Sequence, residues 1–289
     1  QVMYSGGLKG YADLHPWPEL GDSPLEEQLS AIANRQELSP LAKRTLFFAQ
    51  LDAEKRSLNI NLFQGLDIPT SHFLVKDISM PFKCPPEFDR IKIKMGKDLK
   101  KETPVLKNLC ANLEDDKVLV RLDFNCQLTE DAFSTFLESI KEFLPLVEFF
   151  EDPFPFDPDT WEMFQDDFEI SLACDRHSEQ AIQYPDSASI LVIKPAIQEE
   201  VPFIPAQQKL VVTSYLDHPV GQLSAAYVAA KLAQVCPKRV LRCGLNSHFV
   251  YPANNFSQQL AMKGPFFEIP SGTGFGFDDL LEALPWQDL

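Results

Sequence analysis

The stretch that decides the fold runs from residue 118 to residue 151 and reads VLVRLDFNCQLTEDAFSTFLESIKEFLPLVEFFE. It opens with a short apolar strand pattern, Val118–Asp123, and closes with another, Val147–Glu151. Between them, Thr129–Phe143 has the apolar spacing of a helix and begins with a threonine that can cap its first turn. A strand, a helix and a strand in this order predict two parallel strands joined by a crossover helix.

The same alternation continues along the chain in both directions. Its apolar runs of strand length are rich in Val, Ile, Leu and Phe, which suits strands buried on both faces of a parallel sheet. Helical patterns such as Gly221–Val235 lie between several of these runs. Eight strands at this spacing predict an α/β barrel. The predicted strands are His72–Lys76, Arg90–Met95, Val118–Asp123, Val147–Glu151, Ile170–Asp175, Ser189–Lys194, Lys209–Ser214 and Val240–Gly244.

Residues 10–67 read as a small α+β unit that precedes the barrel. Its first helix is predicted at Ser23–Ala33, with Ser23 as the cap and Glu26 completing a capping box. A second helix is predicted at Ser39–Ser57. We expect the Phe- and Pro-rich tail of the chain to fold back onto this unit. The expected domains are a capping part at 1–68, a barrel with the active site at 69–248, and a tail at 249–289 that returns to the capping domain.

Charged residues stand where the predicted strands end. A charge buried at the end of a barrel strand is costly unless it pairs with another charge or binds an ion. The carboxyl ends of barrel strands also form the face on which active sites are built, so these side chains should converge there. The residues concerned are Lys92, Lys94, Asp123, Glu151, Asp175 and Lys194.

The three carboxylates, Asp123, Glu151 and Asp175, supply the hard oxygen ligands that Mg²⁺ prefers, and the same donors suit Mn²⁺. We expect the neighbouring metal ion and the nearness of the lysines to one another to lower the lysine pKa values toward a range useful for proton transfer. Each residue alone has an ordinary explanation: a solvated strand end, a helix cap, an acidic turn or a structural ion pair. Their joint presence in order on consecutive strands favours a site.

Composition limits the partners of the chain. A net charge of −16 over 289 residues repels nucleic acid and anionic lipid, so we expect neither as a partner. No apolar run is long enough to cross a bilayer, and the six cysteines form no Cys-x-x-Cys pair. We therefore expect a soluble cytoplasmic protein with reduced thiols, present as a monomer or a small homo-oligomer.

The chain resembles the enolase superfamily, and within it the muconate-lactonizing subgroup. The strand-end segments are similar to the subgroup's Lys-x-Lys, Asp-x-Asn, Glu-Glu-Pro, Asp-Glu and Lys-Pro motifs, and an early segment is similar to the Gly-x-Gly-Glu-x-x-Pro-x-Pro signature of its capping domain. The segments that carry this resemblance are Arg90–Gly96, Val120–Asn125, Phe149–Pro153, Ala173–Asp175, Val192–Pro195 and Gly10–Pro18. Asp152 departs from the pattern, as does Arg176-His177 after Asp175.

Within the subgroup, the chain is most similar to the o-succinylbenzoate synthase family. Arg121 lies two residues before Asp123 as in an Arg-x-Asp motif, Ser214 resembles a seventh-strand serine, and Gly244-Leu245-Asn246 resembles the loop that holds a succinyl arm. The eighth strand also lacks the Asp-x-Asp that dipeptide epimerases carry. The resemblance implies a modified (β/α)7β barrel with a capping domain formed by the N-terminal segment and the C-terminal tail.

The resemblance also implies a reaction, the Mg²⁺-dependent syn dehydration of 2-succinyl-6-hydroxy-2,4-cyclohexadiene-1-carboxylate in menaquinone biosynthesis, through an enediolate. Lys94 would remove the proton α to the carboxylate and return it to the departing hydroxyl, Lys194 would stabilise the intermediate, and Lys92 would keep Lys94 less basic. The metal ligands would be Asp123, Glu151 and Asp175. The contacts to the dicarboxylate substrate would come from Arg121, Asn125, Ser214, Gly244 and Asn246.

Two other functions remain open from the sequence. An N-acylamino-acid racemase or dipeptide epimerase would use Lys94 and Lys194 as opposed acid and base, and it would exchange the α-proton of its substrate with solvent. A non-catalytic barrel acting as a scaffold is a possibility of another class, and it would fail to bind Mg²⁺.

Overall fold

The computed structural model describes residues 1–80, 82–113, 118–198, 204–260 and 262–288, and it divides into two compact units. The sheet unit comprises Ser71–Ile193 and Phe203–Val211. The terminal unit comprises Gln1–Thr70, Lys194–Pro202 and Val212–Leu289. The domain bounds expected from the sequence stay a prediction.

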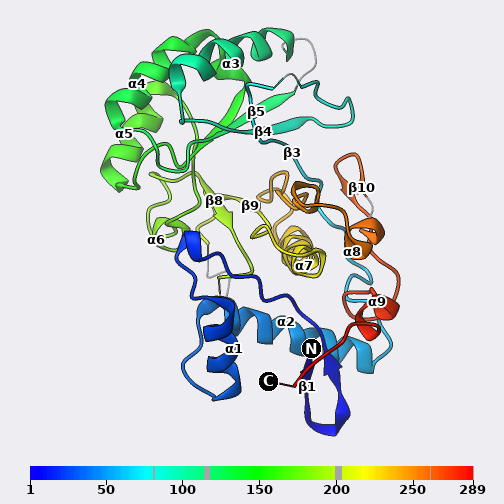
Figure 1. The fold of residues 1–289 in the computed structure, drawn as a ribbon. Helices are drawn as coiled ribbons and strands as arrows, with labels where there is room; N and C mark the ends of the chain where they lie inside the picture. Colours follow the sequence, from blue (N-terminus) through cyan, green and yellow to red (C-terminus); the bar gives the residue numbers. More distant parts are fainter. Residues whose placement is uncertain (81, 114–117, 199–203, 261, 289) are drawn as a thin grey trace. The chain divides into compact units, whose positions relative to one another are not determined.

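Seven parallel strands form the core of the sheet unit, in the order in which they occur in the chain. Each lies within a predicted strand, and several are one to three residues shorter (Figure 1). Most of their interior residues are apolar and buried, as expected of a sheet covered on both faces, and Lys92 and Arg121 are buried charged exceptions. The strands are β3 (Phe73–Val75), β4 (Arg90–Lys94), β5 (Leu119–Asp123), β6 (Val147–Glu151), β7 (Leu172–Cys174), β8 (Ile190–Ile193) and β9 (Lys209–Val212).

The predicted eighth strand, Val240–Gly244, is reduced to isolated bridges. The N–H of Gly244 donates to the carbonyl of Val212 at 2.8 Å, and the N–H of Ser214 donates back to the Gly244 carbonyl at 3.1 Å. On the other side, the N–H of Cys243 donates to the carbonyl of Thr70 at 2.8 Å. This segment therefore hydrogen-bonds both to the end of β9, at Val212, and to Thr70.

Aromatic side chains fix the helices of the sheet unit to its strands. Phe133 lies edge-on to Phe124 and Phe150, with ring centroids 5.9 and 5.4 Å apart. The predicted helix Thr129–Phe143 is capped by Thr129 as expected but is divided at Ile140, where α4 ends and a 3-10 helix, η4, begins. The helices are α3 (Leu99–Leu113), α4 (Glu130–Ser139), η4 (Lys141–Leu146), α5 (Pro158–Phe168) and α6 (Ser178–Ala181).

The terminal unit contains the two predicted N-terminal helices. The second helix, α2, forms as predicted, and Ser39 caps it by accepting the N–H of Ala42 at 3.1 Å. The predicted cap of α1 is wrong, because the chain enters that helix at Pro24 and Ser23 instead accepts the Gln28 side chain through its carbonyl. The elements are β1 (Val2–Met3), η1 (Ser5–Gly7), β2 (Lys9–Gly10), η2 (Pro18–Leu20), α1 (Leu25–Ala33), α2 (Pro40–Ser57), α7 (Pro219–Val235), η5 (His248–Val250), α8 (Asn255–Gln259), β10 (Met262–Lys263), β11 (Phe266–Phe267) and α9 (Asp278–Glu282).

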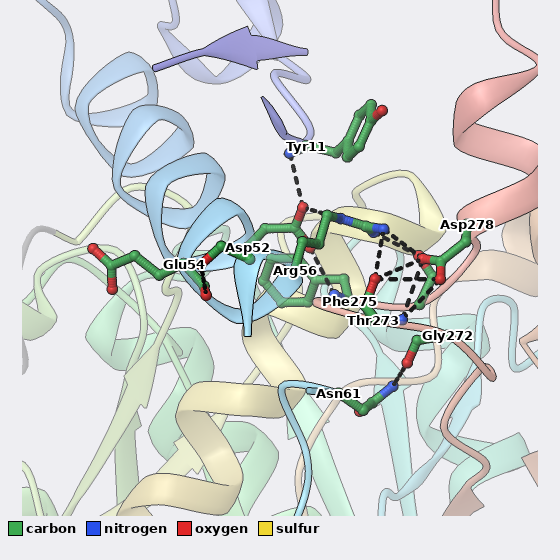
Figure 2. A network of polar contacts seen from close by, with 11 residues as sticks. Tyr11, Asp52, Glu54, Arg56, Asn61, Gly272, Thr273, Phe275 and Asp278 are labelled. Atoms are coloured by element: carbon green, nitrogen blue, oxygen red, sulfur yellow. Dashed lines mark hydrogen bonds and ion pairs between the residues drawn. The ribbon is translucent and has the colours of Figure 1, made fainter. Parts of the chain in front are cut away.

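The C-terminal tail packs against α2 (Figure 2). Asp52 of α2 accepts the N–H of Phe275 at 2.7 Å, and Arg56 forms an ion pair with Asp278 and donates to the carbonyl of Gly276 at 2.9 Å. Gly274 must be a glycine, because a Cβ at this residue would lie 2.0 Å from the Asp52 carboxylate. The N-terminal segment and the tail therefore form one unit.

All six cysteines are free thiols. Among the described residues, no helix combines the length and the apolar character required to span a bilayer.

Candidate active site

The sheet register aligns the predicted site residues on neighbouring strands. Lys94 of β4 lies beside Asp123 of β5, and Asp123 lies beside Glu151 of β6. Side chains that are adjacent across a parallel sheet point to the same face. These three residues therefore project together from the carboxyl ends of their strands.

Lys92 is the cation at the centre of this group. Its Nζ lies 2.6 Å from Glu151 Oε1 and 3.0 Å from Asp123 Oδ2, and the residue is only 8% exposed. Burial lowers the pKa of Lys92, but Asp123, Glu151 and Asp175 together outweigh burial and raise the pKa above its usual value. With these neighbours the shift is opposite to the lowering expected from the sequence, and Lys92 holds its proton firmly.

The two carboxylates bound to Lys92 differ from each other. Lys92 and Lys94 hold the pKa of Asp123 below its usual value against the effect of burial, and Asp123 Oδ1 also accepts the N–H of Asn125 at 3.1 Å. Burial, with the nearby charges of Asp123 and Asp175, raises the pKa of Glu151 to about 8. Glu151 Oε2 is buried and has no hydrogen-bond partner among the described residues. One oxygen of this group is therefore left for a further donor or cation to satisfy.

The donor chemistry fits a hard divalent cation. Asp123, Glu151 and Asp175 offer carboxylate oxygens from three successive strands, and the buried Oε2 of Glu151 lacks a partner among the described residues. As placed, no three acidic, imidazole or thiol side chains of the described residues converge closely enough to hold one ion. Lys92 instead lies between Asp123 and Glu151. A metal would therefore require these carboxylates to turn from Lys92.

Lys94 contrasts with Lys92. It is the exposed last residue of β4, whereas Lys92 is buried. Lys94 lies close enough to Asp123 to lower the pKa of that carboxylate. Of the two lysines, Lys94 is the one whose amine is open to a small molecule.

Asp152 was noted from the sequence only as a departure from a family motif, and the structure gives it a definite set of contacts. Its Oδ1 accepts the N–H of Asp175 and its Oδ2 accepts the N–H of Arg176, both at 3.1 Å. Burial and the charge of Asp175 raise the pKa of Asp152 to about 7. An Asp directly after a strand-end Glu was the available signal, but sequence alone does not show where such a side chain turns.

Arg121, a predicted substrate contact, is fully buried. Its Nε lies 2.6 Å from Glu148 Oε2, its Nη1 lies 2.9 Å from His72 Nδ1, and its guanidinium lies 4.7 Å from the centre of the Phe149 ring. Arginine donates only, so His72 accepts through Nδ1 and carries its proton on Nε2. The described partners of Arg121 are thus protein groups, and its contact with a substrate stays a prediction.

Asn125, the next predicted substrate contact, begins a tight turn after β5. Asn125 and Cys126 both have left-handed backbones, with φ of 50° and 58°. Asn is one of the few residues that adopt this region readily. The turn brings the N–H of Asn125 back to Asp123, and the role of its side chain stays a prediction.

Lys194 belongs to the terminal unit, where its amine faces an aromatic ring. Its Nζ lies 5.9 Å from the centre of the Tyr215 ring, a cation–π distance, and its N–H donates to the Gln198 side chain at 2.8 Å. Tyr215 is tied to the N-terminal loop, because its hydroxyl donates to Asp22 at 3.1 Å and its carbonyl accepts the indole N–H of Trp17 at 2.9 Å. Tyr215 was missed from the sequence, where only its neighbour Ser214 resembled a family motif.

The other predicted substrate contacts in the terminal unit lie together. Ser214 and Gly244 are joined by a backbone hydrogen bond, and Ser214 Oγ lies 2.5 Å from Ser247 Oγ. Asn246 Oδ1 and Thr213 Oγ1 are buried without a hydrogen-bond partner among the described residues. Buried polar atoms of this kind are costly unless a ligand or water satisfies them.

Three solved structures share this fold at low sequence identity. The muconate lactonizing enzyme from Pseudomonas putida has a TM-score of 0.76 at 15% identity, covering 95% of this chain and 90% of that chain. The N-succinyl Arg/Lys racemase from Bacillus cereus has 0.75 at 17%, covering 99% and 89%. A dipeptide epimerase from Methylococcus capsulatus, complexed with Mg and the dipeptide L-Arg-D-Lys, has 0.71 at 16%, covering 95% and 89%. The chain has the α/β barrel fold of the enolase superfamily, as predicted.

Sequence comparison identifies the family within that superfamily. The family described as O-succinylbenzoate synthase, N-terminal domain, matches residues 2–55. The o-succinylbenzoate synthase of Bdellovibrio bacteriovorus is 34% identical over 304 residues, covering 100% of this chain and 90% of that protein. The chain belongs to the o-succinylbenzoate synthase family and is an enzyme of the lyase class.

Proposed function

We propose that the chain catalyses the dehydration of 2-succinyl-6-hydroxy-2,4-cyclohexadiene-1-carboxylate to 2-succinylbenzoate. The reaction removes the proton α to the ring carboxylate and the neighbouring hydroxyl group, which leave together as water, and it makes the ring aromatic. The 34% identity to an o-succinylbenzoate synthase supports this choice of substrate. We place the step in menaquinone biosynthesis, in the cytoplasm, and the six free thiols agree with a reducing compartment.

The observation that carries the proposal is the difference between the two lysines of β4. Lys92 is buried, bound to two carboxylates and held protonated, so it is unsuited to accept a proton. Lys94 is exposed at the strand end beside Asp123. We assign Lys94 as the base that takes the α-proton and as the acid that returns it to the departing hydroxyl.

Asp123, Glu151 and Asp175 would hold a Mg²⁺ ion, with Mn²⁺ as a substitute. When bound, a divalent cation stabilises the negative charge that develops on a substrate carboxylate as its α-proton leaves. The buried, unpartnered Glu151 Oε2 supports the assignment, because it indicates a need for a further donor or cation. Lys92, which is buried beside these carboxylates, would limit their net negative charge.

The terminal unit would supply a second cation and the contacts to the succinyl arm. We assign Lys194 to stabilise developing negative charge, a role that its ammonium can fill without exchanging a proton. Its position over the Tyr215 ring supports a fixed orientation. We assign Ser214, Gly244 and Asn246 to the arm, supported by the buried, unpartnered Oδ1 of Asn246.

The test is to follow aromatic product formation from the cyclohexadiene substrate, with Mg²⁺ and with chelator, for the wild type, Lys94→Ala and Lys92→Met. We expect metal-dependent turnover that falls by about 10³-fold in Lys94→Ala, the size of a general acid–base contribution. An intact wild type that binds Mg²⁺ without turning over this substrate would refute the proposal. Exchange of an N-succinylamino acid α-proton with deuterated solvent would then favour the racemase alternative.

A further inference from the structure

The chain after β7 is held by a side chain at the point where the sheet ends. In a regular parallel ladder, the N–H of Asp175 would donate to the backbone carbonyl of residue 152, because Asp152 already donates its own N–H to Ala173 at 3.0 Å. Here the N–H of Asp175 donates to Oδ1 of the Asp152 side chain at 3.1 Å. The carbonyl of Asp152 accepts the N–H of Cys126 instead, at 2.7 Å.

The backbone of Asp152 explains this exchange of acceptors. Its φ of +43° is left-handed, which turns the chain out of β6 and toward the turn at Cys126. Aspartate tolerates this region better than most residues because its short side chain can bond the local backbone. The carboxylate of Asp152, a residue that is only 2% exposed, therefore replaces its own backbone carbonyl as the acceptor at the end of the ladder.

Both carboxylate oxygens are used on consecutive backbone groups. Oδ2 accepts the N–H of Arg176 at 3.1 Å, next to the bond that Oδ1 makes to Asp175. β7 has only three residues and ends at Cys174, so Asp175 lies beyond its last residue. The two bonds to one carboxylate hold the two peptide planes on either side of the Asp175 Cα, and with them the direction from which the Asp175 side chain leaves the backbone.

We propose that Asp152 is a positioning residue, which orients Asp175 for the metal through the two backbone N–H groups rather than by touching the ion itself. This inference rests on the proposed role of Asp175 as a ligand. We call the pair of hydrogen bonds from Asp175 and Arg176 to Asp152 the Asp152 bracket.

Two substitutions test whether the two acceptor oxygens of the Asp152 bracket are needed, or whether any polar side chain at residue 152 is sufficient. Asp152→Asn keeps the shape of the side chain but offers one acceptor oxygen, so one of the two N–H groups faces an NH₂ group. Asp152→Glu keeps two acceptors on a longer arm. The control is Asp157→Asn at the start of α5, because Asp157 also accepts two bonds, from the N–H and Oγ1 of Thr160 at 3.0 and 2.8 Å, but accepts both on Oδ1, an acceptor that asparagine keeps.

The experiment measures three quantities for the wild type and these variants. They are Mg²⁺ affinity by titration calorimetry, deuterium exchange at the amides of Asp175 and Arg176 in chelator, and thermal unfolding in chelator. We expect Asp152→Asn to weaken Mg²⁺ binding by about 10-fold, the size typical of groups that orient a ligand. In Asp152→Asn we also expect faster deuterium exchange at the amide of Asp175, of Arg176 or of both. Asp152→Glu should recover part of the Mg²⁺ affinity. Asp157→Asn should show the wild-type Mg²⁺ affinity and the wild-type exchange rates.

The outcomes distinguish this inference from the proposed function. Wild-type affinity and wild-type exchange in Asp152→Asn overturn the inference, even where the wild type turns over its substrate. A lower unfolding temperature with unchanged Mg²⁺ affinity also overturns it, because the side chain would then only stabilise the turn. A wild type that binds no Mg²⁺ overturns the inference as well. Product formation tests the proposed function, and a wild type that forms no product refutes that function.

Discussion

Two groups of buried charges, one in each unit, differ in how completely protein donors satisfy their carboxylate oxygens. In the terminal unit, Asp52 accepts from Tyr11 at 3.0 Å, Phe275 at 2.7 Å and Arg56 at 2.6 Å, so its two oxygens share three donors (Figure 2). In the sheet unit, Lys92 is shared by two carboxylates, and one oxygen of Glu151 has no partner among the described residues. The first arrangement is that of a structural joint, and the second is that of a site with capacity for another cation.

The difference shows how to separate a structural ion pair from a functional one. Both groups are buried and both contain a short contact between a cation and a carboxylate, so neither burial nor distance distinguishes them. The informative quantity is the number of lone pairs and charges left over after all protein partners are counted. Substitutions in the two groups should therefore have different effects on the free energy of unfolding and on Mg²⁺ affinity.

The largest effect is expected at the satisfied group. Asp52→Asn should lower the free energy of unfolding by about 3 kcal/mol or more, because it removes one partner of a buried pair and leaves Arg56 less compensated. Urea unfolding of the metal-free protein measures this change. A loss below 1 kcal/mol would mean that the contacts between α2 and the tail are replaceable.

Glu151→Gln should have the opposite character. We expect Mg²⁺ affinity to fall by about 100-fold, or roughly 2.7 kcal/mol. The stability of the metal-free protein should not fall, because the substitution removes surplus negative charge from a buried group. Calorimetric titration and thermal unfolding in chelator measure the two effects. If this variant instead unfolds as readily as Asp52→Asn, the distinction between the two groups is lost.

Asp217, a buried carboxylate next to Asp13, should have an effect of intermediate size on the free energy of unfolding. Burial, with the charge of Asp13 as the next cause, raises the pKa of Asp217 to about 8. The folded state then binds the proton more tightly than the unfolded state, so this contribution to stability is complete below about pH 4 and is lost as the pH rises toward 8. Asp217→Asn, which keeps the acceptor for the N–H of Tyr215, should remove a slope of at most about 1.4 kcal/mol per pH unit. Equal slopes for wild type and variant between pH 5 and pH 8 would contradict this.

The smallest effect is expected at an exposed pair. Asp98 lies 2.8 Å from Lys101, but the two side chains are 42% and 86% exposed. Asp98→Asn should leave the unfolding temperature unchanged within error, because solvent screens the pair and asparagine still serves at the start of α3. A clear drop would show that contact distance alone predicts stability in this protein.

Much of the fold was predictable, because periodicity and strand-end chemistry are local. β3 to β9 each lie within a predicted strand, and the Thr129 cap forms as expected. The Ser23 cap failed because the sequence does not show whether a helix begins before or after Pro24. The eighth strand is shorter than predicted because pairing depends on neighbours that are distant in sequence.

The candidate site was predictable in its residues but not in its interactions. Motif spacing placed Lys92, Lys94, Asp123 and Glu151 on adjacent strands, which the register bears out. Spacing could not show that Lys92 binds both carboxylates, which reverses the expected direction of its pKa. It also could not show the partners of Asp152, because these depend on a left-handed backbone at a single residue.

The joint between α2 and the tail has a consequence for how the chain folds during its synthesis. Arg56 and its partner Asp278 are separated by 222 residues in the sequence. At about 5–20 residues per second, the ribosome needs roughly 10–45 s to make the chain between them. The sheet unit lies wholly between Ser71 and Val211, so its residues are complete well before Asp278 is made. The part of the terminal unit that is synthesised first is therefore among the last to reach its final packing, and Phe48 and Phe275, whose rings meet in that unit, stay apart until then.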